Sequence, residues 1–318
     1  MPPDPYLHER SDFADLIRIV ADEQSLLPAL IEKDYWIMHC LYGLAAQSFT
    51  FELKGGTSLS KGFGIIQRFS EDIDIRIDPE CAPFEVFTGA NQTKKTRHIK
   101  SRQQFYDWLA DSIQINGISS VERDHMFDDD KFRSGGIRLH FDSAFDNPAG
   151  LKEGILLETG FDDTQPNSPR TISSWAYDKA AESAVAVKDN RAIDVPCYNP
   201  GYTFVEKLQT VSTKYRQQQE KGEMPQNFMR HYYDISQLLG HPDVVAFIGT
   251  PEYQERKKVR FRAGDNLNIS ENEAFLLSDP ATRDQYALAY QATASLYFDD
   301  QVPFDVVLEK IQSQIERL

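Results

Sequence analysis

The sequence predicts an α/β (α+β) fold, with a small mixed sheet in an N-terminal lobe and a mostly helical C-terminal lobe. Residues 51–77 have the pattern of a strand, a Gly-Gly turn, a short helix, a loop and a second strand. Residues 134–145 and 153–163 have the pattern of two further strands joined by a polar turn. Beyond residue 204, apolar side chains recur at helical spacing.

The predicted boundary between the lobes lies in a connector. Residues 164–200 are rich in Pro, Asn and Ser, which is typical of connecting segments. A chain of 318 residues is long enough for two moderate domains. We therefore predict a lobe of residues 1–195, which begins with two helices, and a helical lobe of residues 196–318.

Two acidic residues on the second strand of the 51–77 segment predict a cation site. Asp72 and Asp74 are two residues apart, so their side chains point to the same face, roughly 7 Å apart along the strand. An unpaired carboxylate pair repels itself, by about 1–4 kcal/mol at a separation of roughly 4 Å. The pair therefore indicates a bound cation such as Mg²⁺, although a solvated strand edge is the alternative.

The turn before this strand predicts a phosphate site. Gly55 and Gly56 let the backbone approach a ligand closely. Thr57 or Ser58 can cap a helix over residues 57–67, and the N-terminus of a helix binds anions. Lys61 lies one turn further along. A nucleoside triphosphate (NTP) held between this turn and a metal ion on Asp72 and Asp74 fits the pattern, and a purely structural turn is the alternative.

The combined motif, GGTSLSK followed by RFSEDIDI, resembles that of the nucleotidyltransferase superfamily that shares its fold with DNA polymerase beta. It is most similar to the AbiEii/MenT family of toxin nucleotidyltransferases. Three further segments resemble that family: IEKDYW (31–36), EKLQTVSTKYR (206–216) and RHYYDISQLL (230–239). The resemblance implies a magnesium-dependent transferase that uses NTP and belongs to a bacterial toxin–antitoxin pair. It further implies a separate antitoxin partner, winged-helix and AbiEi-like, and an acceptor that in some members is the 3′ end of tRNA.

The resemblance also suggests further site residues. The superfamily places a third carboxylate on a strand beside the acidic pair, and Glu158 is the candidate because it interrupts an apolar strand. Asp142 is the alternative. Either would act as a general base or as a metal ligand. Lys207 corresponds to a lysine that reaches the nucleotide phosphates, and Asp234 to an aspartate that supports the site from the second lobe.

The roles of several other charged groups stay open. Glu32, Lys33 and Asp34 are either active-site groups or, as we expect, a charged turn that orients the second helix against the nucleotide site. Arg230 lies four residues before Asp234, but His231 follows it where family members often have an acidic residue.

The composition limits the partners. The net charge of −15 argues against a protein that coats nucleic acid, so any RNA contact depends on local basic stretches such as residues 93–102 and 255–262. We expect residues 93–102 to be a solvated helix face, and residues 255–262 could equally be an ordinary mixed-charge surface. Three widely separated cysteines fit a reducing compartment, and we find neither a membrane span nor a signal sequence. We therefore expect a cytoplasmic protein.

Two alternatives to RNA modification stay open. The same site could transfer a nucleotide to a small molecule or to a protein hydroxyl. It could also bind a nucleotide without turnover, although the retention of both Asp72 and Asp74 argues against this.

Overall fold

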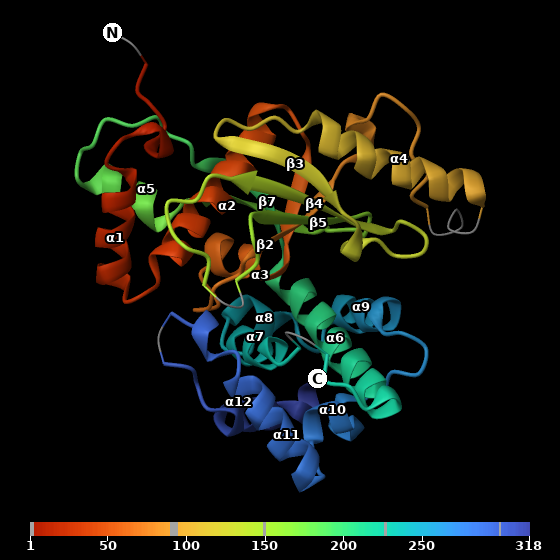
Figure 1. The fold of residues 1–318 in the computed structure, drawn as a ribbon. Coiled ribbons are helices and arrows are strands. Elements are labelled where there is room, and N and C mark those ends of the chain that lie inside the picture. Colours follow the sequence, from red (N-terminus) through yellow and green to blue (C-terminus); the bar gives the residue numbers. More distant parts are fainter. Residues whose placement is uncertain (1–2, 90–94, 149–150, 226–227, 299) are drawn as a thin grey trace. The chain divides into compact units, whose positions relative to one another are not determined.

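The protein divides into two compact units. We describe a computed structural model in which residues 3–89, 95–148, 151–225, 228–298 and 300–318 are placed. The first unit comprises Met1–Phe63 and Phe69–Tyr198, and the second comprises Gly64–Arg68 and Asn199–Leu318. The first contains the sheet and the second is helical, which confirms the predicted α/β class (Figure 1).

Within the described residues, the first unit is built on a seven-stranded mixed sheet of order β3-β4-β5-β2-β1-β7-β6 (Figure 1). Its strands are β1 (Phe51–Lys54), β2 (Asp72–Ile77), β3 (Ile118–Asp124), β4 (Ser134–Phe141), β5 (Ile155–Gly160), β6 (Asn167–Ile172) and β7 (Ala192–Tyr198). β2 pairs antiparallel with β1 and parallel with β5. β5 follows β4 and pairs antiparallel with it, as predicted. The acidic strand therefore lies in the middle of the sheet.

One face of this sheet is apolar and covered by helices. Helix α2 (Pro28–Ala46) contacts β5 and β7, and α4 (Thr96–Ser112) contacts β3 and β4. Trp36 of α2 stacks on Phe141 of β4, with ring centroids 4.8 Å apart. The strand side chains that point to this face are fully buried: Leu53, Ile73, Ile75, Ile137 and Leu157.

The opposite face of the central strands is polar. Because strand side chains alternate, Lys54, Asp72, Asp74 and Glu158 all point away from the helix-covered face. A sheet with antiparallel pairs tolerates one polar face. The charged candidate residues of the first unit thus lie on the face of the sheet that does not pack against helices α2 and α4.

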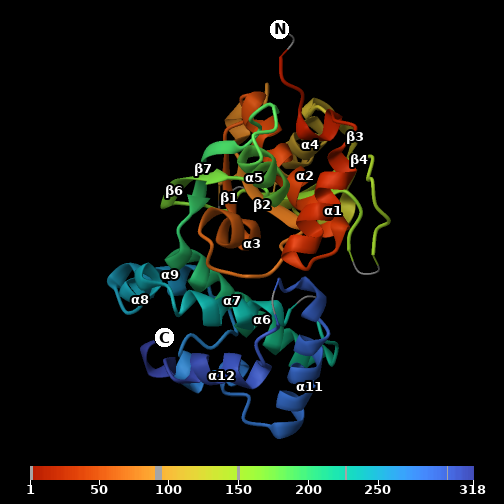
Figure 2. The same ribbon diagram turned by 90° about the vertical axis from the view of Figure 1, so that its left-hand side faces the viewer.

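Three consecutive charged residues near the start of α2, whose role the sequence left open, are buried. Glu32, Lys33 and Asp34 lie within the helix and are 1%, 2% and 1% exposed. Helices α1 (Phe13–Gln24) and α5 (Trp175–Glu182) pack beside α2, so that α2 is buried on nearly all sides (Figure 2). A helix enclosed in this way has no solvated face for its charges, and each needs a partner in the protein.

The second unit is formed by helices. They are α6 (Pro200–Lys221), α7 (Arg230–Leu238), α8 (Pro242–Phe247), α9 (Pro251–Arg260), α10 (Glu273–Leu276), α11 (Pro280–Gln291) and α12 (Phe304–Gln312). α7 packs against α6 and α12. Among the helices of the described residues, none is both long and apolar enough to cross a membrane.

A buried ionic cluster lies inside the second unit. Asp234 of α7 is 0% exposed and accepts two hydrogen bonds from Arg68, at 2.7 and 2.6 Å. Lys207 of α6 lies 2.7 Å from the same carboxylate. Burial alone would raise the pKa of Asp234, but the two cations outweigh it and hold the pKa well below its usual range. The cluster joins the segment Gly64–Arg68 to α6 and α7.

We expect Asp234→Asn to lower the free energy of unfolding by about 3–5 kcal/mol, because it leaves two cations buried without their counter-ion. Urea titration would measure this. Asp305→Asn is the matched control, since Asp305 pairs with Arg283 at the surface, where its side chain is 65% exposed, and should change stability little. Equal small losses in both variants would contradict a stabilising role for the cluster.

A buried histidine makes the first unit acid-sensitive. His39 of α2 donates from Nε2 to the Asn116 carbonyl oxygen at 2.9 Å, and its Nδ1 accepts from Asn190 at 2.8 Å. His8 lies against it, with ring centroids 4.7 Å apart. Burial lowers the pKa of His39 to about 4.

The unfolded chain therefore binds a proton at His39 more readily than the folded chain does. The stability contributed by neutral His39 is complete above pH 6.5 and falls as the pH drops toward 4. Between pH 7.5 and pH 5 we expect the wild-type protein to lose roughly 2 kcal/mol more than His39→Gln loses. Urea titrations of both proteins at both pH values would measure the difference, and an equal loss would contradict the assignment.

Candidate active site

The pairing of β2 with β5 gathers the predicted carboxylates. Asp74 and Glu158 are direct partners across the two parallel strands, and Asp72 lies two residues before Asp74 on the same face. Burial, together with the negative charges of Asp74 and Asp72, raises the pKa of Glu158 to about 7. Asp142, the alternative third carboxylate, lies instead beyond the end of β4 and is exposed. The structure thus places Glu158 beside the acidic pair.

The first glycine of the turn lies directly against this acidic group. Gly55 has a φ of +71°, and a Cβ atom built on it would lie 1.9 Å from Oδ2 of Asp74. Any other residue would be strained in its backbone and would also collide with the carboxylate. The close approach of Gly55 to Asp74 brings the predicted phosphate turn and the predicted metal ligands together.

The residues after the turn are held from within the protein. Helix α3 covers Gly55–Thr57, and a single π-helical turn, Ser58–Gly62, follows. The predicted helix therefore ends at Gly62 and does not reach residue 67. Thr57 donates from its hydroxyl to the Asp72 carbonyl oxygen at 2.7 Å, and Gly56, Thr57 and Ser58 are buried. These contacts fix the start of β2 relative to the turn.

Lys61 is paired within the first unit. Its ammonium group forms an ion pair with Asp34 of α2 and lies 4.0 Å from the centroid of the Trp175 ring. Asp34 also accepts a hydrogen bond from the Trp175 backbone N–H at 3.0 Å. The buried Asp34 therefore positions Lys61 beside the turn and joins it to the first residue of α5.

Sequence reasoning missed Lys54. It is the antiparallel partner of Asp74, on the side opposite Glu158, and its charge opposes the rise in the pKa of Glu158. Lys54 directly precedes the Gly-Gly turn. The sequence alone does not determine the register between β1 and β2. It therefore could not predict that Lys54 pairs with Asp74.

Two further lysines at the site were also missed or left without a role. Lys152 Nζ lies 2.6 Å from Oδ2 of Asp72. Lys33 lies 3.6 Å from Glu71, the residue before Asp72, and burial lowers the pKa of Lys33 to about 8. Oδ1 of Asp72 is buried and finds no hydrogen-bond partner in the part of the chain that the structure describes. A buried carboxylate oxygen without a protein partner is costly, and either water or a cation would satisfy it.

The donor set fits Mg²⁺ shared with a substrate. Among the described residues, no three His, Cys, Asp or Glu side chains cluster closely enough to hold a metal ion on their own. Mg²⁺ commonly binds through one or two carboxylates and takes its other ligands from phosphates and water. Asp72 and Asp74, which lie on the same face of β2, supply two carboxylates. The buried Oδ1 of Asp72 has no hydrogen-bond partner among the described residues.

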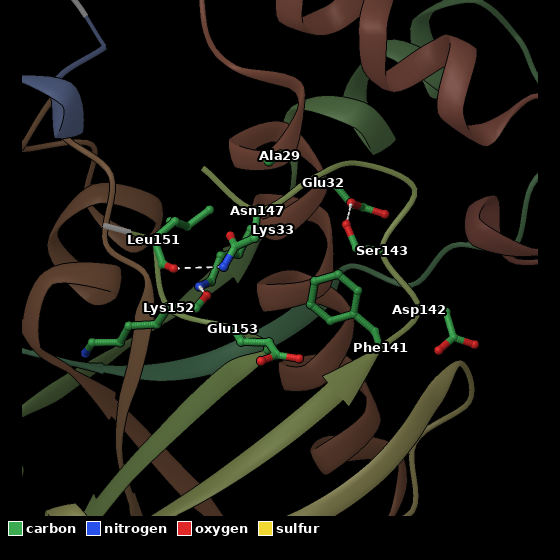
Figure 3. A pocket seen from close by; sticks show the side chains of 11 residues that line it. Ala29, Glu32, Lys33, Phe141, Asp142, Ser143, Asn147, Leu151, Lys152 and Glu153 are labelled. Atoms are coloured by element: carbon green, nitrogen blue, oxygen red, sulfur yellow. Dashed lines mark hydrogen bonds between the residues drawn. The ribbon is translucent and has the colours of Figure 1, made fainter. Parts of the chain in front are cut away.

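A cavity of about 430 Å³ lies next to this site. It is bordered by the start of α2, the end of β4 and residues 151–154 (Figure 3). Lys33 and Lys152 line it, as does Glu32, which accepts hydrogen bonds from Ser143 and from the Ala144 backbone at 2.6 and 3.0 Å. The cavity and Asp72 are therefore connected through Lys152.

Lys207 and Asp234, the site residues suggested by the resemblance, belong to the second unit. Both are buried and pair with each other. The Asp234 carboxylate pairs with both Arg68 and Lys207. Asp234 therefore helps to fix the position of the Lys207 side chain. Arg230, four residues earlier, lies at the start of α7 and is half-buried.

The predicted basic strip is only partly a charged surface. Lys95, Arg97 and Lys100 are exposed, whereas Lys94 lies outside the described residues. Arg102 is buried and donates hydrogen bonds to the carbonyl oxygens of Lys131 and Phe87, at 2.9 and 2.7 Å. Arg102 is therefore neither a solvated residue nor a phosphate contact, since its guanidinium fixes two loops.

Comparison with known proteins identifies the family of the chain. A search of curated proteins finds no match to the chain. A family model described as the nucleotidyl transferase AbiEii toxin of type IV toxin–antitoxin systems matches residues 39–310, which include every strand and the acidic pair with its glycine turn. The chain therefore belongs to the AbiEii family of nucleotidyl transferase toxins.

Proposed function

We propose that this protein is a magnesium-dependent nucleotidyltransferase that moves a nucleoside monophosphate from NTP to an acceptor hydroxyl group. The observation that carries the proposal is the position of Asp72, Asp74 and Glu158 on one polar face of the sheet, with Asp74 against Gly55. Such a face combines metal ligands, a base and a phosphate turn within one unit.

In this proposal Asp72 and Asp74 hold the metal ion, which neutralises charge on the triphosphate when it is bound. The backbone N–H groups of the Gly55–Gly56 turn face the phosphates. Lys54 adds positive charge beside Asp74. Thr57 and Ser58 maintain the turn from its buried side. Because Mg²⁺ prefers phosphate oxygens and few carboxylates, the same residues bind metal and substrate together.

Glu158 acts as the general base in this proposal. A carboxylate with a pKa of about 7 is well matched to accept a proton near neutral pH. It takes the proton from the acceptor hydroxyl, whose oxygen attacks the α-phosphorus in line. The bond from that phosphorus to the bridging oxygen breaks, and pyrophosphate leaves with the electron pair. The positive charges of Lys54 and Lys61 stabilise the charge that develops on the phosphates.

Lys207 and Asp234 enter the proposal through the family resemblance. We propose that Lys207 contacts the nucleotide phosphates and that Asp234 orients it as a positioning residue. Their ion pair of 2.7 Å supports the second assignment.

The acceptor we propose is an RNA end, the 3′ end of tRNA, and the partner is an antitoxin of the winged-helix, AbiEi-like type in the cytoplasm. The family supports a toxin with an antitoxin partner. The exposed Lys95, Arg97 and Lys100 supply a local positive surface on an otherwise acidic chain.

We expect Asp72→Asn and Asp74→Asn each to reduce transfer of label from [α-³²P]NTP to tRNA by at least about a hundredfold, because each removes a metal ligand. Asp130→Asn, at an exposed aspartate of the same unit, is the control and should retain activity. Parallel reactions with tRNA whose 3′ hydroxyl is oxidised, and with protein and small-molecule extracts, identify the acceptor. Undiminished transfer in both variants would remove these carboxylates from the mechanism.

Gly55→Ala should abolish transfer while leaving the protein folded, because the new methyl group occupies the position of the Asp74 carboxylate. Gly222→Ala is the matched control: Gly222 has a similar φ of +75°, but nothing lies within 4 Å of the added Cβ. Both substitutions carry a backbone strain of about 1 kcal/mol. The collision with Asp74 occurs only at Gly55, so equal activities in the two variants would show that the contact is unimportant for transfer.

A further inference from the structure

We propose that Lys152 is a triphosphate-binding residue that also occupies the metal side of Asp72 until nucleotide and metal arrive together. The inference rests on the proposed function and deepens it, because it couples the binding of metal to the binding of nucleotide. It is carried by the contacts of Lys152 in the structure.

The ammonium group of Lys152 takes the place of a metal ion at Asp72. Its Nζ lies 2.6 Å from Oδ2 of Asp72, whose side chain is 11% exposed. The other carboxylate oxygen, Oδ1, is buried without a hydrogen-bond partner among the described residues. Lys152 therefore pairs with one of the two carboxylate oxygens that a divalent ion would coordinate. Any ion that binds to Asp72 must compete with Lys152.

The backbone of Lys152 is fixed on both sides. Its N–H donates to Oε2 of Glu71 at 3.0 Å, and its carbonyl oxygen accepts a hydrogen bond from Lys33 Nζ. Lys33 and Glu71 also form an ion pair with each other. These contacts hold the Lys152 backbone beside the residue that precedes Asp72.

The side chain of Lys152, in contrast, is only partly enclosed. It is 30% exposed. In Figure 3 it extends away from Phe141 and Ser143, on the far side of the cavity. A lysine head group is a compact charge on a flexible stem and keeps its charge when it exchanges one anionic partner for another. Displacement from Asp72 therefore needs no change in the backbone.

The charge balance makes the displacement depend on the nucleotide. Lys152 offsets part of the negative charge of the Asp72–Asp74 pair, which a metal ion would otherwise neutralise. A metal ion that binds alone must expel the Lys152 ammonium without offering it another partner. A metal ion that arrives with a triphosphate supplies phosphate oxygens to receive that ammonium. Metal and triphosphate therefore bind cooperatively, and Lys152 is the source of the coupling.

Binding measurements without turnover test this. Mn²⁺ binding is followed by the loss of the free-ion EPR signal. Binding of the α,β-imido triphosphates of the four common nucleosides, in the presence of Mn²⁺, is followed by calorimetry. We expect Lys152→Met to bind Mn²⁺ alone roughly tenfold more tightly and the triphosphate roughly tenfold more weakly, since one ion pair is lost in each case.

The opposite signs of the two effects distinguish this role from a structural one, because a damaged fold would weaken both. Lys179→Met is the matched control, since Lys179 is 31% exposed and pairs with Glu23. It should change neither affinity. Lys152→Gln provides a second variant, and thermal unfolding of each protein verifies that it is folded.

Unchanged or weaker Mn²⁺ binding in Lys152→Met and Lys152→Gln, or unchanged triphosphate binding, would overturn the inference. Failure of the proposed function looks different: the wild-type protein would then bind neither Mn²⁺ nor triphosphate, and both proposals fall. If the wild-type protein binds both ligands and Asp72→Asn binds neither, while the Lys152 variants match wild type, the inference about Lys152 fails by itself.

Discussion

The contact between a glycine turn and a carboxylate governs the rest of the first unit. Gly55 can approach Asp74 closely because it has no side chain, and the pairing of β2 with β5 then brings Glu158 to the other side of Asp74. Neighbouring carboxylates repel each other, and burial increases the repulsion, as the raised pKa of Glu158 indicates. This repulsion is confined to the polar face of the sheet, which does not form part of the hydrophobic core.

Helix α2 is the scaffold on which this arrangement depends. Three consecutive residues of a helix point in directions about 100° apart, so Glu32, Lys33 and Asp34 reach three different parts of the unit. They contact the loop after β4, Glu71 beside the acidic strand, and Lys61 beside the glycine turn. Buried charges are stable only when they are paired, and these pairs hold the segments around the site in position. All three residues lie before residue 39, where the family match begins.

Local patterns predicted much of the fold. The four strands read from residues 51–77 and 134–163 are present, and the region beyond residue 204 is helical as expected, because alternation and helical spacing reflect which side of an element is buried. The errors arise where tertiary packing overrides composition. Residues 164–200 were expected to be a connector, but they contain β6, α5 and β7. Arg102 was expected in a solvated or RNA-binding stretch because charged residues usually lie at the surface, yet packing buried it and supplied partners. The helix predicted over residues 57–67 ends at Gly62. The chain then enters Gly64–Arg68, which belongs to the second unit.

The sequence by itself determined which chemistry the protein carries. The spacing of Asp72 and Asp74 places them on one strand face, and the adjacent glycines define the turn, because both features depend on covalent geometry over a few residues. The tertiary structure decided which other groups join them. Glu158 and Lys54 reach Asp74 through strand register, and Lys152 reaches Asp72 through a loop anchored on α2. Register and loop anchoring depend on contacts between distant parts of the chain, which no local pattern encodes.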